Sequence, residues 1–546
     1  MRIQDIIVRG ATQQARSKRT KHLFITRRFQ PEDAQMIPHA DRRVAVIGAG
    51  ISGIAAANML KKQGYDVVVF EKAAALGGVW AVAYPGVRLQ NLAVHYHLSD
   101  LPWPFTPDEH PTREQILRYL CAAVEQRKLD VRLSHDVQAL DEQPDGWIVH
   151  YRNQSGEHAE HFGYVVVAVG QYTEGKYMPQ FPGQADFHGP ILTERQITDP
   201  EIFDNKRVVV VGFGKSALDM VTFAALRGAQ VSHVFRTPRW LMPEWIFGVH
   251  MTYALFTRFG SVMMPSWGHP TGAERFLHRR LGAVVSGFWQ MIAAVLRFQT
   301  QRHGSGRDQA ALARLKAVQP THPLVPDLRS AAAIAPAEYY RLVAEGRIQP
   351  YQAEVCGFSR EAIQLNSGAE LPCDLVVLSV GSQKPAFAFL PLQYRDLVEA
   401  EIDGVQLYRH LIHPCIPRLG FAGFNHGFMH VPAVEIGTLW LCAYWQGQLQ
   451  LPCVEEMEHS IAHMTDWKRR HIHFEPSRLC ATSTRFQQYL DILLKDLQIS
   501  PYRKLPNIFA EVFGRYTATD YRDVMAEYNR RQAQRTTPLQ PLPVHM

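Results

Sequence analysis

Residues 44–72 place the strongest constraint on the fold of this chain. They read VAVIGAGISGIAAANMLKKQGYDVVVFEK, and Gly48, Gly50 and Gly53 follow the first apolar run with the spacing G-x-G-x-x-G. The first glycine permits a tight turn, the second lets a pyrophosphate approach the backbone, and the third lets the following helix pack on the strand. Glu71 ends the second β-branched run, where a carboxylate can accept hydrogen bonds from ribose hydroxyls. The segment therefore predicts a dinucleotide-binding βαβ unit.

A second βαβ pattern covers residues 207–236. Its turn reads GFGKSA at 212–217, so glycines hold the first two positions and alanine holds the third. Phe235 stands at the offset that Glu71 has in the first unit, and Arg236 follows it. Without the acid, no carboxylate repels the 2′-phosphate of NADPH, and a guanidinium can bind that phosphate with two hydrogen bonds. The pattern favours NADPH over NADH here, which leaves the first unit for FAD.

Net charge and cysteine content narrow the class of protein. The chain has 58 basic and 51 acidic residues, and its net charge of +7 is a small excess that lies largely at the two ends. No basic helix or aromatic-rich basic patch accompanies it, so nucleic-acid binding is not predicted. The seven cysteines include no C-x-x-C pair. They suit a reducing compartment, which predicts a cytoplasmic protein, and they offer no metal site or disulfide framework.

Membrane insertion is not expected from the hydrophobic pattern. The longest apolar run, at residues 281–296, is shorter than the roughly 20 residues that a membrane span needs. We interpret it as a buried or interfacial helix within an aromatic-rich segment. Membrane contact is therefore conceivable but not expected.

The order of these patterns predicts the domain organisation. Two apolar runs, 164–169 and 374–380, each end at a glycine, Gly170 and Gly381, and both are expected to belong to the first domain. The fold class is therefore α/β with two Rossmann-like domains, the NADPH domain being inserted into the FAD domain and carrying a helical insertion of its own. The expected boundaries are a basic extension at 1–40, the FAD domain at 41–190, the NADPH domain at 191–370 with its insertion at about 240–320, the second part of the FAD domain at 371–475, and a C-terminal helical extension and tail at 476–546.

The cysteine positions separate two classes of flavoprotein. Flavin disulfide reductases carry a redox-active cysteine pair soon after the first βαβ unit, whereas this chain has no cysteine between Glu71 and Cys121. A reduced flavin that has no disulfide to pass electrons to is expected to react with oxygen or a small molecule instead. At this point the chain resembles the flavin-containing monooxygenase family of class B flavoprotein monooxygenases over about residues 42–460. The matching segments are GAGISG at 48–53, EK at 71–72, GGVW at 77–80, LQNLAVHYHLSDLPWP at 89–104, GFGKSALD at 212–219, RTPRWLMP at 236–243 and PAVEIGTLW at 432–440.

The resemblance implies a set of site residues. Gln90 falls where animal members have an asparagine beside the flavin, and Asn91 is a second candidate at the same face, so both are predicted to be catalytic. The predicted cofactor-binding residues are Gly48, Gly50, Ser52, Gly53, Glu71, Lys72, Gly78, Val79, Trp80, Arg88, Gln90, Val137, Gly170, Gly212, Gly214, Lys215, Ser216, Arg236, Thr237, Gly381 and Glu435.

Two departures from the family bear on the reaction. A linker signature F-x-G-x-x-x-H begins at Phe187, but Thr193 replaces its histidine. The segment YPGVR at 84–88 is similar to Baeyer–Villiger monooxygenases, in which a following aspartate helps to set the active arginine. Gln90 stands in place of that aspartate, so ketone oxygenation is disfavoured without being excluded.

These patterns predict an NADPH-dependent monooxygenase. Hydride would pass from NADPH to FAD, oxygen would add at flavin C4a, and a nitrogen or sulfur nucleophile would take the distal oxygen while Gln90 hydrogen-bonds the hydroperoxide. The expected partners are molecular oxygen and a small organic substrate; a homodimer is left open. One alternative is Baeyer–Villiger oxygenation of a ketone or aldehyde. An alternative of another class is a flavin-bearing binding protein without oxygenase turnover.

Overall fold

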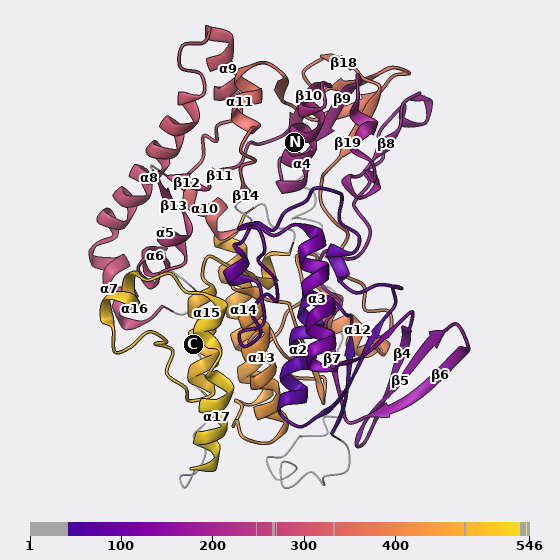
Figure 1. Cartoon of the computed structure of the whole chain (residues 1–546), viewed down its shortest axis with the longest axis vertical. Coiled ribbons are helices and arrows are strands. Elements are labelled where there is room, and N and C mark those ends of the chain that lie inside the picture. Colours follow the sequence, from indigo (N-terminus) through magenta and orange to yellow (C-terminus); the bar gives the residue numbers. More distant parts are fainter. Residues whose placement is uncertain are drawn as a thin grey trace, which may run out of the picture. The chain divides into compact units, whose positions relative to one another are not determined.

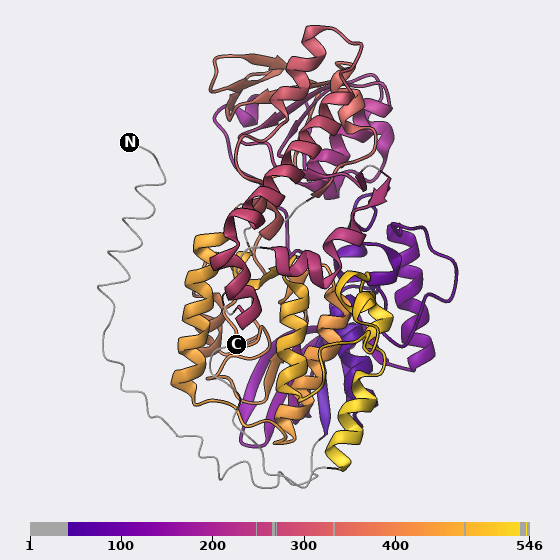
Figure 2. The same ribbon diagram turned by 90° about the vertical axis from the view of Figure 1, so that its left-hand side faces the viewer.

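The computed structural model describes residues 42–246, 248–264, 268, 270–330, 333–473, 477–534 and 542 (Figures 1 and 2). The predicted basic extension at 1–40, nearly all of the proline-rich tail, and Phe247 and Trp267 of the aromatic segment lie outside the described residues.

The first sheet has five parallel strands in the order β20-β7-β1-β2-β3. Their bounds are β20 Leu419–Phe421, β7 Tyr164–Val167, β1 Arg43–Ile47, β2 Asp66–Glu71 and β3 Asp130–Leu133. Alternate residues of β1 enter different cores: Val44 and Val46 pack with the helices α2 (Ile51–Lys62), α3 (Arg113–Arg127) and α13 (His430–Trp445). Ala45 and Ile47 pack towards the antiparallel strands β4 (Asp136–Gln143), β5 (Gly146–Asn153) and β6 (Gly156–Phe162). Burial on both faces explains why β1, β2 and β7 are rich in valine.

The second sheet is also parallel, in the order β15-β10-β9-β19-β8. Its strands are β15 Ile348–Gln352, β10 Gln230–Phe235, β9 Arg207–Val211, β19 Leu375–Leu378 and β8 Ile191–Leu192. All five lie between β7 and β20 in the sequence, which confirms the prediction that the second nucleotide-binding domain is inserted into the first. The helices α4 (Lys215–Leu226), α9 (Gln309–Ala317) and α11 (Tyr339–Ala344) pack on it (Figure 1), and the antiparallel strands β16 (Val355–Phe358), β17 (Ala362–Leu365) and β18 (Glu370–Pro372) adjoin it.

One predicted strand assignment is wrong. The run at 374–380 was expected to return the chain to the first domain, but β19 pairs with β9 and β8 of the second sheet. Asp374 fixes this pairing, since its carboxylate accepts from the backbone N–H of Arg207 at 2.8 Å and from the Arg207 guanidinium at 2.6 Å. The strand that completes the first sheet is β20 instead. A buried apolar run shows that a strand lies inside a sheet but not which sheet contains it.

The helical insertion is present. Its helices are α5 Thr252–Leu255, α6 Arg258–Met263, α7 Gly272–Arg280, α8 Gly282–Arg302 and α10 Leu324–Arg329. It also has two strand pairs: β11 Leu241–Met242 pairs with β14 Ala333–Ile334, and β12 Trp245–Ile246 pairs with β13 Val249–His250. Helix α8 contains the apolar run at 281–296. It buries Val285 and Trp289 and exposes Val284 and Met291. Within the described ranges no single helix is long and apolar enough to cross a membrane. The helices α7 and α8, with a bend of 78° between them, are together long and apolar enough to do so.

The C-terminal helices form part of the first domain's core. Helix α15 (Phe486–Asp496) packs against α13, and its Asp496 accepts hydrogen bonds from buried Arg409 at 2.8 Å and from Trp440 Nε1 at 3.0 Å. The remaining elements of this part are α12 Leu392–Glu399, β21 His426–Gly427, α14 Val454–His471, β22 Ala481–Ser483, α16 Ile508–Phe513 and α17 Val524–Ala533. The segment at 477–534, predicted as an extension, is therefore integral to this core.

Candidate functional site: two dinucleotide turns

The first glycine turn has the geometry that its spacing predicts. Gly48 follows β1 at φ +109°, and a Cβ there would lie 2.6 Å from the Ala168 carbonyl oxygen. A Cβ on Gly53 would lie 1.8 Å from the Gly48 oxygen, so the turn and the helix packing both exclude side chains. Gly50 differs, because the nearest atom to its added Cβ is the Gly78 Cα at 3.7 Å. Space is thus left only where a pyrophosphate would approach.

The N-terminus of α2 is open to an anion. Its N-cap is Gly50, no side chain caps it, and its first turn contains no acidic residue. Backbone N–H groups that lack such partners bind phosphate oxygens well, and the helix dipole adds to this. Ser52 lies in this turn, and its hydroxyl is 2.8 Å from His430 Nε2. Burial lowers the pKa of His430 to about 4, so the imidazole is neutral at pH 7.

Glu71 ends β2 beside the same turn. Its carboxylate is buried and accepts from the backbone N–H of Ala49 at 2.8 Å and of Ala73 at 2.9 Å. This holds the acid next to the glycines, in the position that ribose recognition requires. Lys72 points to the surface and pairs with Glu174 at 3.4 Å.

The GGVW segment forms a second wall beside the turn. Gly78 has φ +54°, and a Cβ there would lie 3.1 Å from the Gly50 Cα, so the two backbones pass close together. Val79 is 37% exposed, and Trp80 Nε1 donates to the Tyr96 hydroxyl at 2.9 Å. Two further predicted residues complete the surroundings: Gly170 follows β7 at φ +76°, and Val137 lies on β4 against the core. The open turn, the uncapped helix and the buried acid fit the adenosine diphosphate part of FAD.

The second turn repeats this geometry. Gly212 has φ +128°, and its added Cβ would lie 2.3 Å from the Ser379 oxygen, whereas nothing lies within 4 Å of a Cβ on Gly214. Gly214 is the N-cap of α4, again without a side-chain cap or an acidic residue in the first turn. Gly381 follows β19 at φ +116° with open space around it. This turn therefore fits a second dinucleotide.

The other predicted residues of the second site lie at the ends of α4 and β10. Arg236 and Thr237 are exposed directly after β10. Lys215 and Ser216 begin α4, and Lys215 Nζ donates to Asp219 Oδ2 at 2.6 Å.

The predicted catalytic amides link distant segments. Gln90 Oε1 accepts from the Ile334 backbone N–H at 3.0 Å, which connects the first domain to β14. Asn91 Nδ2 donates to the Phe428 carbonyl at 2.6 Å. Their catalytic roles remain predictions, because these contacts show positioning rather than chemistry.

Glu435, on α13, connects that helix to the segment around Ser99. Its Oε2 accepts from the Ser99 backbone N–H at 2.9 Å, and burial raises the pKa of its carboxyl group to about 7.

Arg88 is paired with the loop that precedes α3. Its guanidinium donates to Asp108 Oδ2 at 2.6 Å and to the His110 carbonyl at 3.0 Å, and its side chain is 52% exposed. A cofactor contact by Arg88 stays a prediction.

Sequence reasoning missed the contact that joins the two sites. The Tyr84 hydroxyl donates to Asp219 Oδ2 at 2.7 Å, and both side chains are buried. Burial, with the Asp219 charge adding to it, raises the pKa of Tyr84 well above its usual value. The sequence analysis used Tyr84 only as part of the YPGVR segment, and an aspartate on α4 more than a hundred residues later carries no signal of pairing.

Comparison with known proteins supports the resemblance to flavin-containing monooxygenases. Residues 41–281 match the family described as flavin-binding monooxygenase-like. The chain is 28% identical over 532 residues to probable flavin-containing monooxygenase 1 of Arabidopsis thaliana, which covers 88% of this chain and 96% of that protein. The chain is similar to flavin-containing monooxygenases over most of its length. The predicted FAD and NADPH agree with this family, and so does the enzyme class, an FAD-dependent monooxygenase.

Solved structures share the fold. S-allyl-L-cysteine S-oxygenase from Allium sativum superimposes with a TM-score of 0.57 at 18% identity, over 90% of this chain and 99% of that one. Cyclohexanone monooxygenase from Rhodococcus sp. Phi1, bound to NADP⁺, gives a TM-score of 0.59 at 18% identity, over 91% and 99% of the two chains. Both similarities agree with two Rossmann-like domains in one chain.

Proposed function

We propose that this protein is a flavin-containing monooxygenase that oxygenates a small organic substrate at nitrogen or sulfur, using NADPH and molecular oxygen. The observation that carries the proposal is the pair of open glycine turns on adjoining domains, linked by Tyr84 and Asp219. FAD, when bound, would take a hydride from NADPH and activate oxygen. None of the seven cysteines forms a disulfide, which supports a flavin that does not pass electrons to a dithiol and favours a cytoplasmic enzyme.

The protein's own part in this reaction is to bind, orient and exclude water. The α2 and α4 N-termini would hold the two pyrophosphates, and Glu71 would hold the ribose of FAD. Gln90 and Asn91 would present amides at the flavin face, held in place by Ile334 and Phe428. Such a site depends on positioned hydrogen bonds and water exclusion more than on a charged acid–base pair.

The position of Arg88 favours heteroatom oxygenation. In the sequence interpretation, Baeyer–Villiger chemistry needs this arginine at the flavin with a neighbouring aspartate. Here Gln90 replaces that aspartate, and the Arg88 guanidinium pairs with Asp108 near the surface. The S-oxygenase fold relative is compatible with the same choice.

Baeyer–Villiger oxygenation is the second candidate, because the YPGVR segment itself is retained. Paired thioether and ketone probes separate the two reactions. We expect a sulfoxide from the thioether with matched NADPH consumption, and little ester from the ketone. An ester as the main product would favour the second candidate. FAD-loaded protein that consumes no NADPH with any probe would indicate a binding protein.

A further inference from the structure

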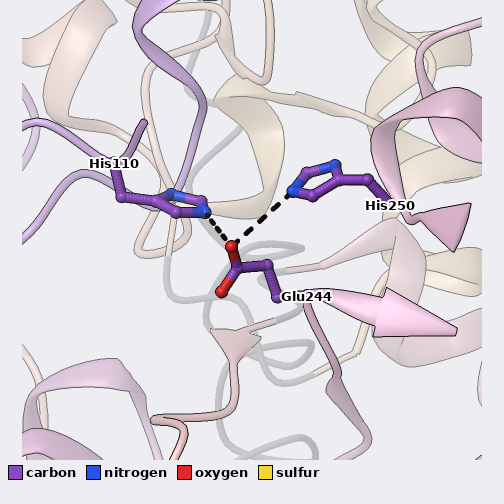
Figure 3. A group of neighbouring side chains, drawn as sticks. All are labelled: His110, Glu244 and His250. Carbon is purple, nitrogen blue, oxygen red and sulfur yellow. Dashed lines mark ion pairs between the residues drawn. The ribbon is translucent and has the colours of Figure 1, made fainter. Parts of the chain in front are cut away.

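Three ionisable side chains outside both nucleotide sites meet in the described structure: His110, Glu244 and His250 (Figure 3). His110 lies in the loop before α3, Glu244 precedes β12, and His250 ends β13. The two imidazoles approach the same carboxylate oxygen of Glu244 from opposite sides. The cluster thus joins the first domain to the helical insertion.

The distances in the cluster are too long for hydrogen bonds. His110 Nε2 lies 3.6 Å from Glu244 Oε1, and His250 Nε2 lies 4.0 Å from it. Both Nε2 atoms are buried, and neither has a hydrogen-bond partner among the described residues. Such atoms normally find a partner. Two ligands of a tetrahedral zinc ion lie about 3.4 Å apart, because each zinc–ligand bond is about 2.1 Å long.

The remaining ring nitrogens are held by neighbouring groups. His110 Nδ1 lies 2.9 Å from the Leu89 carbonyl, so it donates there and leaves the Nε2 lone pair towards Glu244. His250 Nδ1 lies 2.8 Å from the Thr252 hydroxyl and accepts from the Thr252 backbone N–H at 3.3 Å. A metal at Nε2 would select the other tautomer, in which Nδ1 donates to the hydroxyl and the long bond from the backbone N–H is lost. Metal-binding histidines usually have their second nitrogen fixed in this way.

We propose that His110, Glu244 and His250 bind one Zn²⁺ ion. Two imidazoles and a carboxylate form a ligand set that suits zinc. Glu109 Oε1 lies 3.9 Å from His250 Nε2, and this carboxylate or a water molecule completes the coordination. The sequence analysis did not anticipate a metal, because the ligands come from two segments with no metal-binding spacing between them.

The zinc has a structural role. His110 binds the Leu89 carbonyl through its ring and accepts from Arg88 through its backbone, so its segment supports the strand-like stretch that leads to Gln90. On the other side, the Met251 N–H donates to the Glu244 carbonyl at 3.0 Å and closes the β12–β13 hairpin. The ion would therefore fix the hairpin of the insertion against this stretch. This inference stands independently of the oxygenated atom.

The test uses full-length, flavin-loaded protein dialysed against a chelator. Titration with ZnCl₂ by calorimetry, with the thermal unfolding midpoint measured in parallel, should show one ion per chain and a higher midpoint. His250→Gln and Glu244→Gln should each weaken that binding about 10-fold or more and remove the rise. His150→Gln is the matched control. His150 also pairs with a carboxylate, Asp141 at 2.8 Å, but lies outside the cluster. The His150→Gln protein should therefore bind zinc as the wild-type protein does.

Equal affinity and stoichiometry in the wild type and in both cluster variants would overturn the proposal, as would no zinc binding by the wild type. If the variants do not fold, X-ray absorption at the zinc edge of the zinc-loaded wild-type protein tests the proposal instead. It should show nitrogen and oxygen ligands with imidazole scattering. Sulfur ligands would overturn the proposal, since they would place the ion at cysteines.

Discussion

At the scale of single residues, Glu435 makes part of the chain's stability depend on pH. Its pKa rises from 4.5 to about 7 because burial disfavours the carboxylate. Between these two values the folded chain holds more protons than the unfolded chain, so stability falls as pH rises through this window and stays low above it. The full loss is on the order of 3 kcal/mol.

Glu435→Gln should remove this loss, because the amide stays neutral and can still accept from the Ser99 N–H. We expect its thermal unfolding midpoint to exceed that of the wild type by about 2–4 °C at pH 8 and to match it at pH 5. Midpoints measured from pH 5 to pH 8 test this. A constant difference between the two proteins across that range would show that Glu435 does not titrate as described.

Arg236 is the residue that should choose between nicotinamide cofactors. It is exposed at the end of β10, where the acid of the first unit is replaced by Phe235. Arg236→Ala should raise the KM for NADPH about 10-fold or more, because a charge-assisted contact to the 2′-phosphate is lost, and should leave the KM for NADH unchanged.

Steady-state kinetics with both cofactors measure this effect. Arg227→Ala is a control in the same domain, since Arg227 pairs with Asp204 at 2.8 Å and should not affect either cofactor. The role of Arg236 would be rejected if its variant kept the wild-type KM for NADPH.

At the scale of elements, a Gly→Ala substitution should have different effects at the two glycines of the second turn. On Gly212 it would meet the Ser379 oxygen at 2.3 Å, whereas on Gly214 it would meet nothing within 4 Å. Gly214→Ala should therefore fold and keep its FAD but raise the KM for NADPH, because the methyl occupies the space of the pyrophosphate. Gly212→Ala should lower the unfolding midpoint.

Flavin absorbance, thermal unfolding and NADPH kinetics together separate these outcomes. Gly287→Ala is the control, because Gly287 lies on α8 with open space around it. Its KM for NADPH should equal that of the wild type. Normal NADPH kinetics in Gly214→Ala would mean that the pyrophosphate binds elsewhere.

The elements also show what the sequence could predict. Both glycine turns and the order of the two domains along the chain follow from local spacing and periodicity, which act within a few residues. The assignment of β19 failed, because its partners depend on Asp374 meeting Arg207 across 167 positions. The Tyr84–Asp219 bond and the His110 cluster were missed for the same reason. Local patterns specify elements, whereas pairing between distant elements depends on packing that one sequence does not display.

At the scale of the whole molecule, the reaction requires the two nucleotide sites to be held together. The Tyr84–Asp219 bond links the YPGVR stretch of the first domain to the helix of the second glycine turn. The same carboxylate receives Lys215 at the start of α4. Tyr84 therefore couples the flavin side to the NADPH side through a residue that need not touch either cofactor.

Tyr84→Phe removes the hydroxyl and leaves the ring in its apolar surroundings. Asp219 keeps Lys215, so we expect a stability loss of about 1–3 kcal/mol, the usual effect of deleting one partner of a buried hydrogen bond. FAD content and the KM for NADPH should stay close to the wild type, while the rate of flavin reduction by NADPH should fall, because the hydride donor and acceptor are less well aligned. Anaerobic stopped-flow absorbance measures that rate. If Tyr84→Phe lowered the unfolding midpoint but left the reduction rate unchanged, the bond would stabilise the chain without aligning its cofactors, and another contact between the domains, such as Gln90 with Ile334, would have to hold them.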